Sequence, residues 1–178
     1  MCYITTMISG IFPESATINR RYVMKKAIVF LLALCCAALT AAELPDLSKA
    51  AAWSKAGWSK SVYTCTEDVL CIERTQDGSG AWRTRAIPVK AGEKISGSVE
   101  INYSSQDGPG VARLGINCLD GDGKRVKFLN PIQFSSLTDG FETKTFSITV
   151  PEGAVQIMVY ACLDKKGKVE FRNFKFDK

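Results

Sequence analysis

Hydrophobic and polar residues alternate one by one along much of this chain. In the run 95–103 an apolar phase alternates with Ser, Glu and Asn, and the run 145–150 repeats the pattern with Thr and Ser. Successive side chains of a strand point to opposite faces, so this period of two predicts strands with one buried face. The residues expected to face a core in these two runs are Ile95, Gly97, Val99, Ile101, Tyr103, Phe146, Ile148 and Val150.

Six further segments predict strands: 69–75, 82–89, 112–119, 124–128, 155–163 and 168–176. Turns that contain Gly separate them, and Gly permits the positive φ of a tight reversal. Eight or nine short strands without an amphipathic helix of three turns predict an all-β fold, a two-sheet antiparallel β-sandwich. Only 46–54 could be briefly helical. A bulge near Arg172 and Asn173 would reconcile the two apolar phases of the last strand.

The first 42 residues have a different pattern. Lys25 and Lys26 precede an unbroken apolar run at 27–39, and small residues follow at 40–42, which is the pattern of a secretory signal peptide. We predict a non-native upstream extension at 1–23, a signal peptide at 24–42 and a single β-sandwich domain at 43–178. The apolar run is too short to cross a bilayer, so we expect no membrane span and a secreted or periplasmic protein.

Charge and composition exclude several classes of function. The formal charge is +5, from 23 basic and 18 acidic residues, but beyond residue 42 the balance is 19 minus 17, or +2. No basic stripe suits nucleic acid, which we exclude as a partner. The chain has no His, the commonest general base and a frequent metal ligand. We therefore expect no enzyme, although a small glycoside hydrolase needs only two carboxylates. Candidates for these are Glu100, Glu142 and Glu170.

Four cysteines remain after the predicted signal peptide, an even number in a chain bound for an oxidising compartment. Cys65 and Cys71 flank the polar turn 66–68, which favours a disulfide across a hairpin. Cys118 and Cys162 each lie late in a predicted strand. They form a second disulfide or are small buried apolar residues, and both interpretations stay open.

Several motifs follow one another along the chain beyond the signal peptide. They are Asp68-Val69-Leu70-Cys71-Ile72, Ala81-Trp82-Arg83-Thr84, the segment 87–97 that begins Ile87-Pro88-Val89-Lys90, Asp120-Gly121-Asp122-Gly123-Lys124, the segment 146–154 and the segment 167–176. Each motif alone is weakly specific, but their order resembles that of carbohydrate-binding modules of the galactose-binding-like jelly-roll superfamily, of the type that binds cellulose or xylan. The resemblance covers most of the chain beyond the signal peptide.

The resemblance implies a jelly-roll β-sandwich that binds a glycan through aromatic side chains, commonly as an accessory to a glycoside hydrolase. We expect the module to stand alone behind its signal peptide, which would be a departure from the family. The family's last strand often has an Asp associated with structural calcium, but here the position holds Arg172 and Asn173, and a cation would repel Arg. Asp120-Gly121-Asp122-Gly123 is interpreted as a hairpin turn rather than a calcium loop. We therefore expect no cofactor and no metal.

Sugar binding in such folds rests on aromatic rings that pack against pyranose rings, with polar side chains nearby. Trp82 is the leading candidate, because it opens a predicted strand after a Gly-rich turn and is followed by Arg83 and Arg85. The alternative places Trp82 in the core. Trp58, next to Gly57, is a second candidate, and Tyr103 a third that also fits a core position. The wider set of aromatic candidates adds Trp53, Tyr63 and Tyr160.

The sequence thus predicts a monomeric, secreted, non-catalytic module that recognises a polysaccharide or oligosaccharide through surface aromatics. An alternative from another class is a structural or adhesive envelope protein that uses the same sandwich for protein contacts. The glycan-binding hypothesis predicts that Trp82→Ala weakens polysaccharide retention and leaves the melting temperature nearly unchanged.

Overall fold

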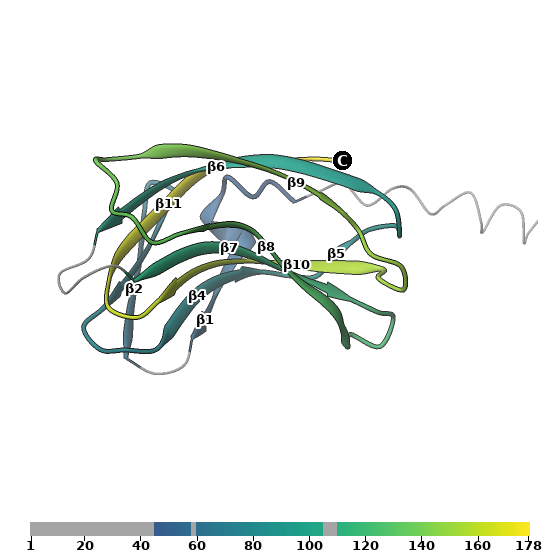
Figure 1. The fold of residues 1–178 in the computed structure, drawn as a ribbon, viewed down its shortest axis with the longest axis horizontal. Helices are drawn as coiled ribbons and strands as arrows, with labels where there is room; N and C mark the ends of the chain where they lie inside the picture. The colour runs from purple at the N-terminus through teal and green to yellow at the C-terminus, as the bar shows by residue number, and fades with distance from the viewer. Residues whose placement is uncertain (1–44, 58–59, 105–109) are drawn as a thin grey trace, which may run out of the picture. The chain divides into compact units, whose positions relative to one another are not determined.

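Two antiparallel sheets form the protein in a computed structural model that describes residues 45–57, 60–104 and 110–178. The first sheet, called sheet A, and the second, sheet B, lie in separate layers (Figure 1). A single turn of 3-10 helix, Ala50–Ala52, precedes the first strand. Sheet A has the order β1 (Trp53–Gly57), β4 (Ser79–Thr84), β10 (Gln156–Asp164), β7 (Val111–Leu119) and β8 (Arg125–Phe134), with β5 (Ile87–Pro88) also paired to β10. Sheet B has the order β2 (Ser61–Thr66), β3 (Val69–Arg74), β11 (Gly167–Asp177), β6 (Lys94–Ser104) and β9 (Glu142–Thr149).

The predicted fold class is confirmed: the protein is an all-β, two-sheet antiparallel sandwich. The strands expected from period two are present, with β4 shifted toward the N-terminus and β8 extended beyond the predicted 124–128. Two strands, β1 and β2, were not predicted. Both lie at the edge of a sheet, where few side chains are buried and the alternation is weak.

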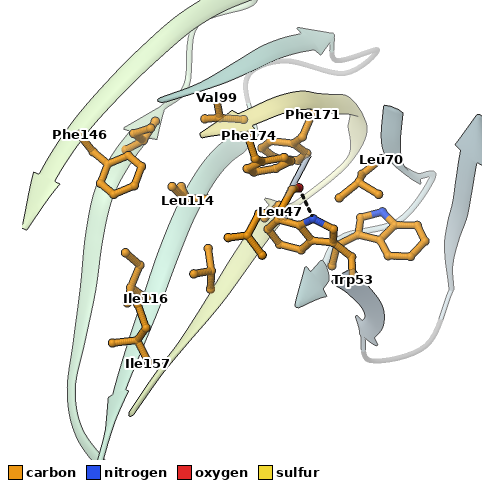
Figure 2. Close-up of a cluster of buried hydrophobic side chains, with 14 of the residues drawn as sticks. Leu47, Trp53, Leu70, Val99, Leu114, Ile116, Phe146, Ile157, Phe171 and Phe174 are labelled. Carbon is orange, nitrogen blue, oxygen red and sulfur yellow. Dashed lines mark hydrogen bonds between the residues drawn. The ribbon is translucent and has the colours of Figure 1, made fainter. Parts of the chain in front are cut away.

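The core lies between the inner faces of the two sheets (Figure 2). The alternating run in β6 supplies Ile95, Val99, Ile101 and Tyr103, each fully buried. Sheet A contributes Ile157, Val159, Ala161 and Leu163 from β10 in the same way. Burial of apolar side chains at about 25 cal/mol per Å² is the main force that holds two such sheets together.

Trp53 connects the segment before β1 to this core. Trp53 Nε1 donates a buried hydrogen bond of 2.9 Å to the carbonyl of Leu47, the dashed line in Figure 2. The Trp53 ring also packs on Phe174, with 4.5 Å between ring centroids. A buried indole N–H needs a partner, so this hydrogen bond fixes the segment that leads into the sandwich.

Two local predictions are also met. The register of β11 against β6 shifts between Arg172 and Lys175, which is the expected bulge, and Asn173 there has φ 52°. Asp120-Gly121-Asp122-Gly123 forms the hairpin turn between β7 and β8. The Asp120 carboxylate accepts hydrogen bonds from the backbone N–H of Asp122 and Lys124 at 3.0 and 2.8 Å, which hold the turn closed.

The disulfide predicted between Cys65 and Cys71 does not form in the structure, and Cys118 and Cys162 follow the alternative interpretation of small buried residues. Cys65 lies opposite Leu70 and Cys71 opposite Thr64 in the β2–β3 ladder, so neighbouring positions put the two thiols on opposite faces of sheet B. Cys118 faces the core with Ile157, whereas Cys162 points outward from β10 opposite Arg113. All four cysteines are free.

No helix within the described ranges is both long enough and apolar enough to span a bilayer.

Candidate functional site

The outer face of sheet A carries a cavity of about 580 Å³. Five neighbouring strands of the sheet contribute to it, so the sheet itself forms the floor. Its walls combine two aromatic rings with amide, guanidinium and ammonium groups. The lining residues are Lys55, Ala56 and Gly57 of β1, Ser79, Gly80, Ala81 and Arg83 of β4, Arg113 and Asn117 of β7, Arg125 and Phe128 of β8, and Tyr160 and Cys162 of β10.

The strand register explains why Tyr160 lies in this cavity. Its neighbours Val159 and Ala161 are fully buried in the core, so the alternation of β10 turns Tyr160 outward. Across the sheet it lies opposite Arg83 on one side and Gly115 on the other. The glycine has no side chain of its own beside the Tyr160 ring.

Gly115 makes room for the second aromatic ring. A Cβ atom at this position would lie 2.6 Å from Phe128 Cζ, so the ring occupies the space that any other residue would fill. The guanidinium carbon of Arg113 lies 5.7 Å from the centroid of the Phe128 ring, within the range of a cation–π contact. Tyr160 and Phe128 therefore reach the same outer face from β10 and β8.

Polar groups surround the two rings. Arg113 Nη2 lies 3.0 Å from Asp164 Oδ2, and Ser79 Oγ donates to the same carboxylate, which fixes that guanidinium. Arg113 Nε and Asn117 Oδ1 are buried and lack a hydrogen-bond partner among the described residues. Unsatisfied polar atoms are rare in folded proteins and call for an explanation. The lining thus offers both donors and acceptors to a bound polar molecule.

Cys162 lies at the floor of the cavity but is poorly suited to catalysis. Burial raises the pKa of its thiol to about 11. The thiolate is the nucleophilic form of cysteine, and at neutral pH almost none is present. This residue therefore serves as a small apolar part of the floor.

Two predicted binding residues are placed differently from the expectation. Trp82 is only 6% exposed, its Nε1 donates to the Cys71 carbonyl at 3.1 Å, and Tyr63 packs edge-on against it at 5.5 Å. Tyr103 is 0% exposed. Neither ring lies on the surface, because both belong to the inward phase of their strands. The expectation that they serve as exposed platforms is corrected by this burial.

The other predicted residues have separate outcomes. Arg83 is exposed and lines the cavity. Arg85 is exposed but is not part of the lining. Trp58 lies outside the described residues.

The carboxylates considered for glycosidase chemistry lie on sheet B rather than in the cavity. Glu100 accepts hydrogen bonds from Arg172 and Asn173. Glu170 is bonded to Asn102 and Lys168, and Glu142 to Lys144. Each is held in an ion pair or hydrogen bond of its own sheet. Within the described part of the chain no group of three or more His, Cys, Asp or Glu residues could hold a metal ion.

Sequence reasoning did not find Phe128, Arg113, Asn117 or Arg125. Tyr160 was named only in the wider set of aromatics. The alternation of β10 could have singled it out, because Tyr160 falls in the polar phase of an otherwise buried strand. The closeness of Phe128 to Gly115 depends on the pairing of β7 with β8, which is not apparent from either strand alone.

Comparison with known proteins supports the fold. No protein-family model and no curated protein matches the sequence. Among solved structures, a carbohydrate-binding module of the β-sandwich superfamily gives a TM-score of 0.58 at 9% identity, over 78% of this chain and 62% of that one. The CBM22-1 xylan-binding domain from Paenibacillus barcinonensis gives 0.53 at 11% identity, over 73% and 88%. These similarities confirm the predicted resemblance at the level of fold, the jelly-roll sandwich of carbohydrate-binding modules.

The same fold also occurs inside a larger protein. The enzymatically active domain of bacteriophage CBA120 tailspike protein 4 gives a TM-score of 0.57 at 13% identity, over 72% of this chain. This chain spans about a fifth, 20%, of the length of that tailspike chain. The sandwich alone therefore does not decide between a binding module and part of an enzyme.

Proposed function

We propose that the protein is an exported, non-catalytic module that binds a glycan in the cavity on the outer face of sheet A. The observation that carries this proposal is the placement of Tyr160 and Phe128 in one cavity of about 580 Å³ together with polar side chains. Aromatic rings pack on the apolar faces of pyranoses, and polar groups around them bond the hydroxyls. Solved carbohydrate-binding modules with this fold, one of them a xylan-binding domain, support the assignment.

Export rests on the signal peptide predicted at 24–42, and lack of catalysis on the chemistry of the cavity. In the described part of the chain its lining contains no Asp, Glu or His, and its one thiol is protonated at neutral pH. Carboxylates and imidazoles are the groups that most often act as general acids and bases, and the thiolate is the nucleophilic form of cysteine. The proposal therefore assigns the cavity to recognition alone.

A glycan array of the full chain tests the proposal. We expect binding to at least one polysaccharide, lowered tenfold or more, equivalent to about 1.4 kcal/mol, by Tyr160→Ala and by Phe128→Ala. The matched control is Phe141→Ala. Phe141 is also half-buried but does not line the cavity. Its ring packs under Arg172, whose guanidinium carbon lies 3.7 Å from the ring centroid.

Two outcomes would contradict the proposal. One is the absence of binding to every glycan on a broad array while circular dichroism shows folded protein. The other is glycan binding that both cavity variants retain. Isolation of a discrete protein partner without glycan binding would favour the adhesive alternative. A surface for protein contacts is expected to gather exposed apolar side chains in one patch. The large exposed apolar side chains of the described residues instead lie on separate elements: Val62, Val126, Leu137 and Val155.

A further inference from the structure

The cavity on sheet A has one sign of charge. Among the described residues its lining includes four cationic side chains and no carboxylate, although the chain beyond residue 42 is nearly balanced at +2. The basic surplus is thus concentrated where the aromatic rings lie. A cleft lined by one sign of charge focuses the electrostatic field and raises the local concentration of oppositely charged ligands. The four cations are Lys55, Arg83, Arg113 and Arg125.

Two of the three guanidinium groups have no ion-pair partner among the described residues. Arg83 and Arg125 form no ion pair and no side-chain hydrogen bond with any other described residue, and both are exposed. Arg113 differs, because Asp164 neutralises it at 3.0 Å. Arg83 on β4 and Arg125 on β8 have β10 and β7 between them, so they flank the strands that carry Tyr160 and Gly115. Two guanidinium groups without an ion pair therefore line the cavity: Arg83, opposite Tyr160 on the neighbouring strand, and Arg125, on the same strand as Phe128.

The acidic residues near Arg125 in the sequence do not pair with it. Asp120 accepts two backbone hydrogen bonds within the β7–β8 turn. Asp122 is exposed in the same turn and does not line the cavity. Neither carboxylate forms an ion pair with Arg125. The charge of Arg125 thus stays available to a ligand.

We propose that the cavity selects an acidic glycan, in which pyranose rings pack on Tyr160 and Phe128 and an oxyanion on the sugar binds Arg83 or Arg125. This proposal rests on the proposed glycan-binding function and adds the chemical class of the ligand. A guanidinium presents a planar fork of N–H donors that matches the oxygens of a carboxylate, and it also suits a sulfate. A neutral glycan would leave both arginines without a counter-charge.

Isothermal titration of the full chain with four polymers tests this selectivity. Polygalacturonate carries carboxylates on pyranose rings, and its fully methyl-esterified form has the same rings without charge. A sulfated galactan supplies a different oxyanion, and poly-L-glutamate supplies carboxylates without sugar rings. We expect polygalacturonate or the sulfated galactan to bind at least tenfold more tightly than the methyl ester and poly-L-glutamate. Whether polygalacturonate or the sulfated galactan binds more tightly shows whether the cavity prefers a carboxylate or a sulfate.

Charge variants assign the selectivity to the cavity. Arg83→Gln, Arg125→Gln or both should lower the affinity for the acidic glycan about tenfold, reduce the salt dependence of that affinity, and leave the melting temperature unchanged. Lys94→Gln is the matched control, since Lys94 is an exposed cation of sheet B outside the cavity. It should change none of these values.

Several results would overturn the inference. Equal affinity for polygalacturonate and its methyl ester, with both lost in Tyr160→Ala, would show a glycan site without acid selectivity and leave the proposed function intact. Binding of poly-L-glutamate as tightly as polygalacturonate would show attraction of charge alone. Failure to bind any glycan would remove the proposed function and this inference together.

Discussion

The Phe128 ring lies so close over Gly115 that a Cβ atom there would come within 2.6 Å of Phe128 Cζ. The glycine belongs to the centre of β7 and the phenylalanine to the edge strand β8. At this point β7 has no side chain, and the Phe128 ring from the neighbouring edge strand lies directly over its backbone. This relationship brings Phe128 into the cavity that also holds Tyr160.

Gly115→Ala should therefore weaken glycan binding. The added methyl group pushes the Phe128 ring outward, and we expect a loss of affinity of several-fold, with a cost in stability of about 1 to 3 kcal/mol from overpacking. Titration with the bound glycan and urea denaturation measure the two effects. Gly121→Ala is the control, because nothing lies within 4 Å of a Cβ at that position. Unchanged affinity in Gly115→Ala would show that the Phe128 ring position is irrelevant to binding.

Trp82→Ala should destabilise the protein instead of removing an exposed platform. The ring is 6% exposed and its N–H is bonded inside the sandwich, so truncation leaves a large cavity and should cost about 3 to 5 kcal/mol. The melting temperature, measured by calorimetry, should fall clearly, whereas in Tyr160→Ala it should change little. A Trp82→Ala protein with wild-type stability and lost glycan binding would restore the original expectation.

The error over Trp82 has a physical cause. An alternation with a period of two shows which residues of a strand share a face. It identifies the buried face only when the residues of the other face are polar. In β6 the opposite phase is polar and the core residues were predicted correctly. In β4 the residues Gly80, Ala81 and Trp82 are all buried, so alternation does not distinguish the two faces. Which phase meets the second sheet depends on tertiary packing.

The same limit applies to the site. The alternation within β10 is visible in the sequence, but the position of Tyr160 between Arg83 and Gly115 depends on pairing with β4 and β7. Those partners are far apart in the chain, and no turn fixes their register. The fold class could therefore be predicted from local patterns, whereas the residues that line the cavity could not.

The cysteines give a chemical test of the strand register. Because Cys65 and Cys71 point to opposite faces of sheet B, peptide mapping under non-reducing conditions should find no disulfide between them, nor between Cys118 and Cys162. In folded protein, iodoacetamide should modify Cys65 first, since it is exposed and the other three are buried. Burial raises the pKa of Cys162 to about 11, so this thiol should react only after denaturation. A Cys65–Cys71 bridge would contradict the β2–β3 register.

Acid should weaken the bulge in β11 through Glu100. Hydrogen bonds from Asn173 and then Arg172 hold the pKa of the Glu100 carboxyl below its ordinary value. A lowered pKa in the folded state means that these contacts stabilise the protein fully above the ordinary glutamate pKa of about 4.3. Their contribution is lost as the pH falls through the lower folded value.

Glu100→Gln should consequently lower the melting temperature at pH 7, and the difference from wild type should shrink as the pH is reduced below about 4. Thermal unfolding across pH 2 to 8 measures both curves. Glu152→Gln serves as the matched control, because Glu152 is exposed and forms no ion pair with another described residue. A Glu100→Gln difference that stays constant down to pH 2 would mean that the carboxylate charge does not hold the bulge, and that packing of Arg172 over Phe141 does so instead.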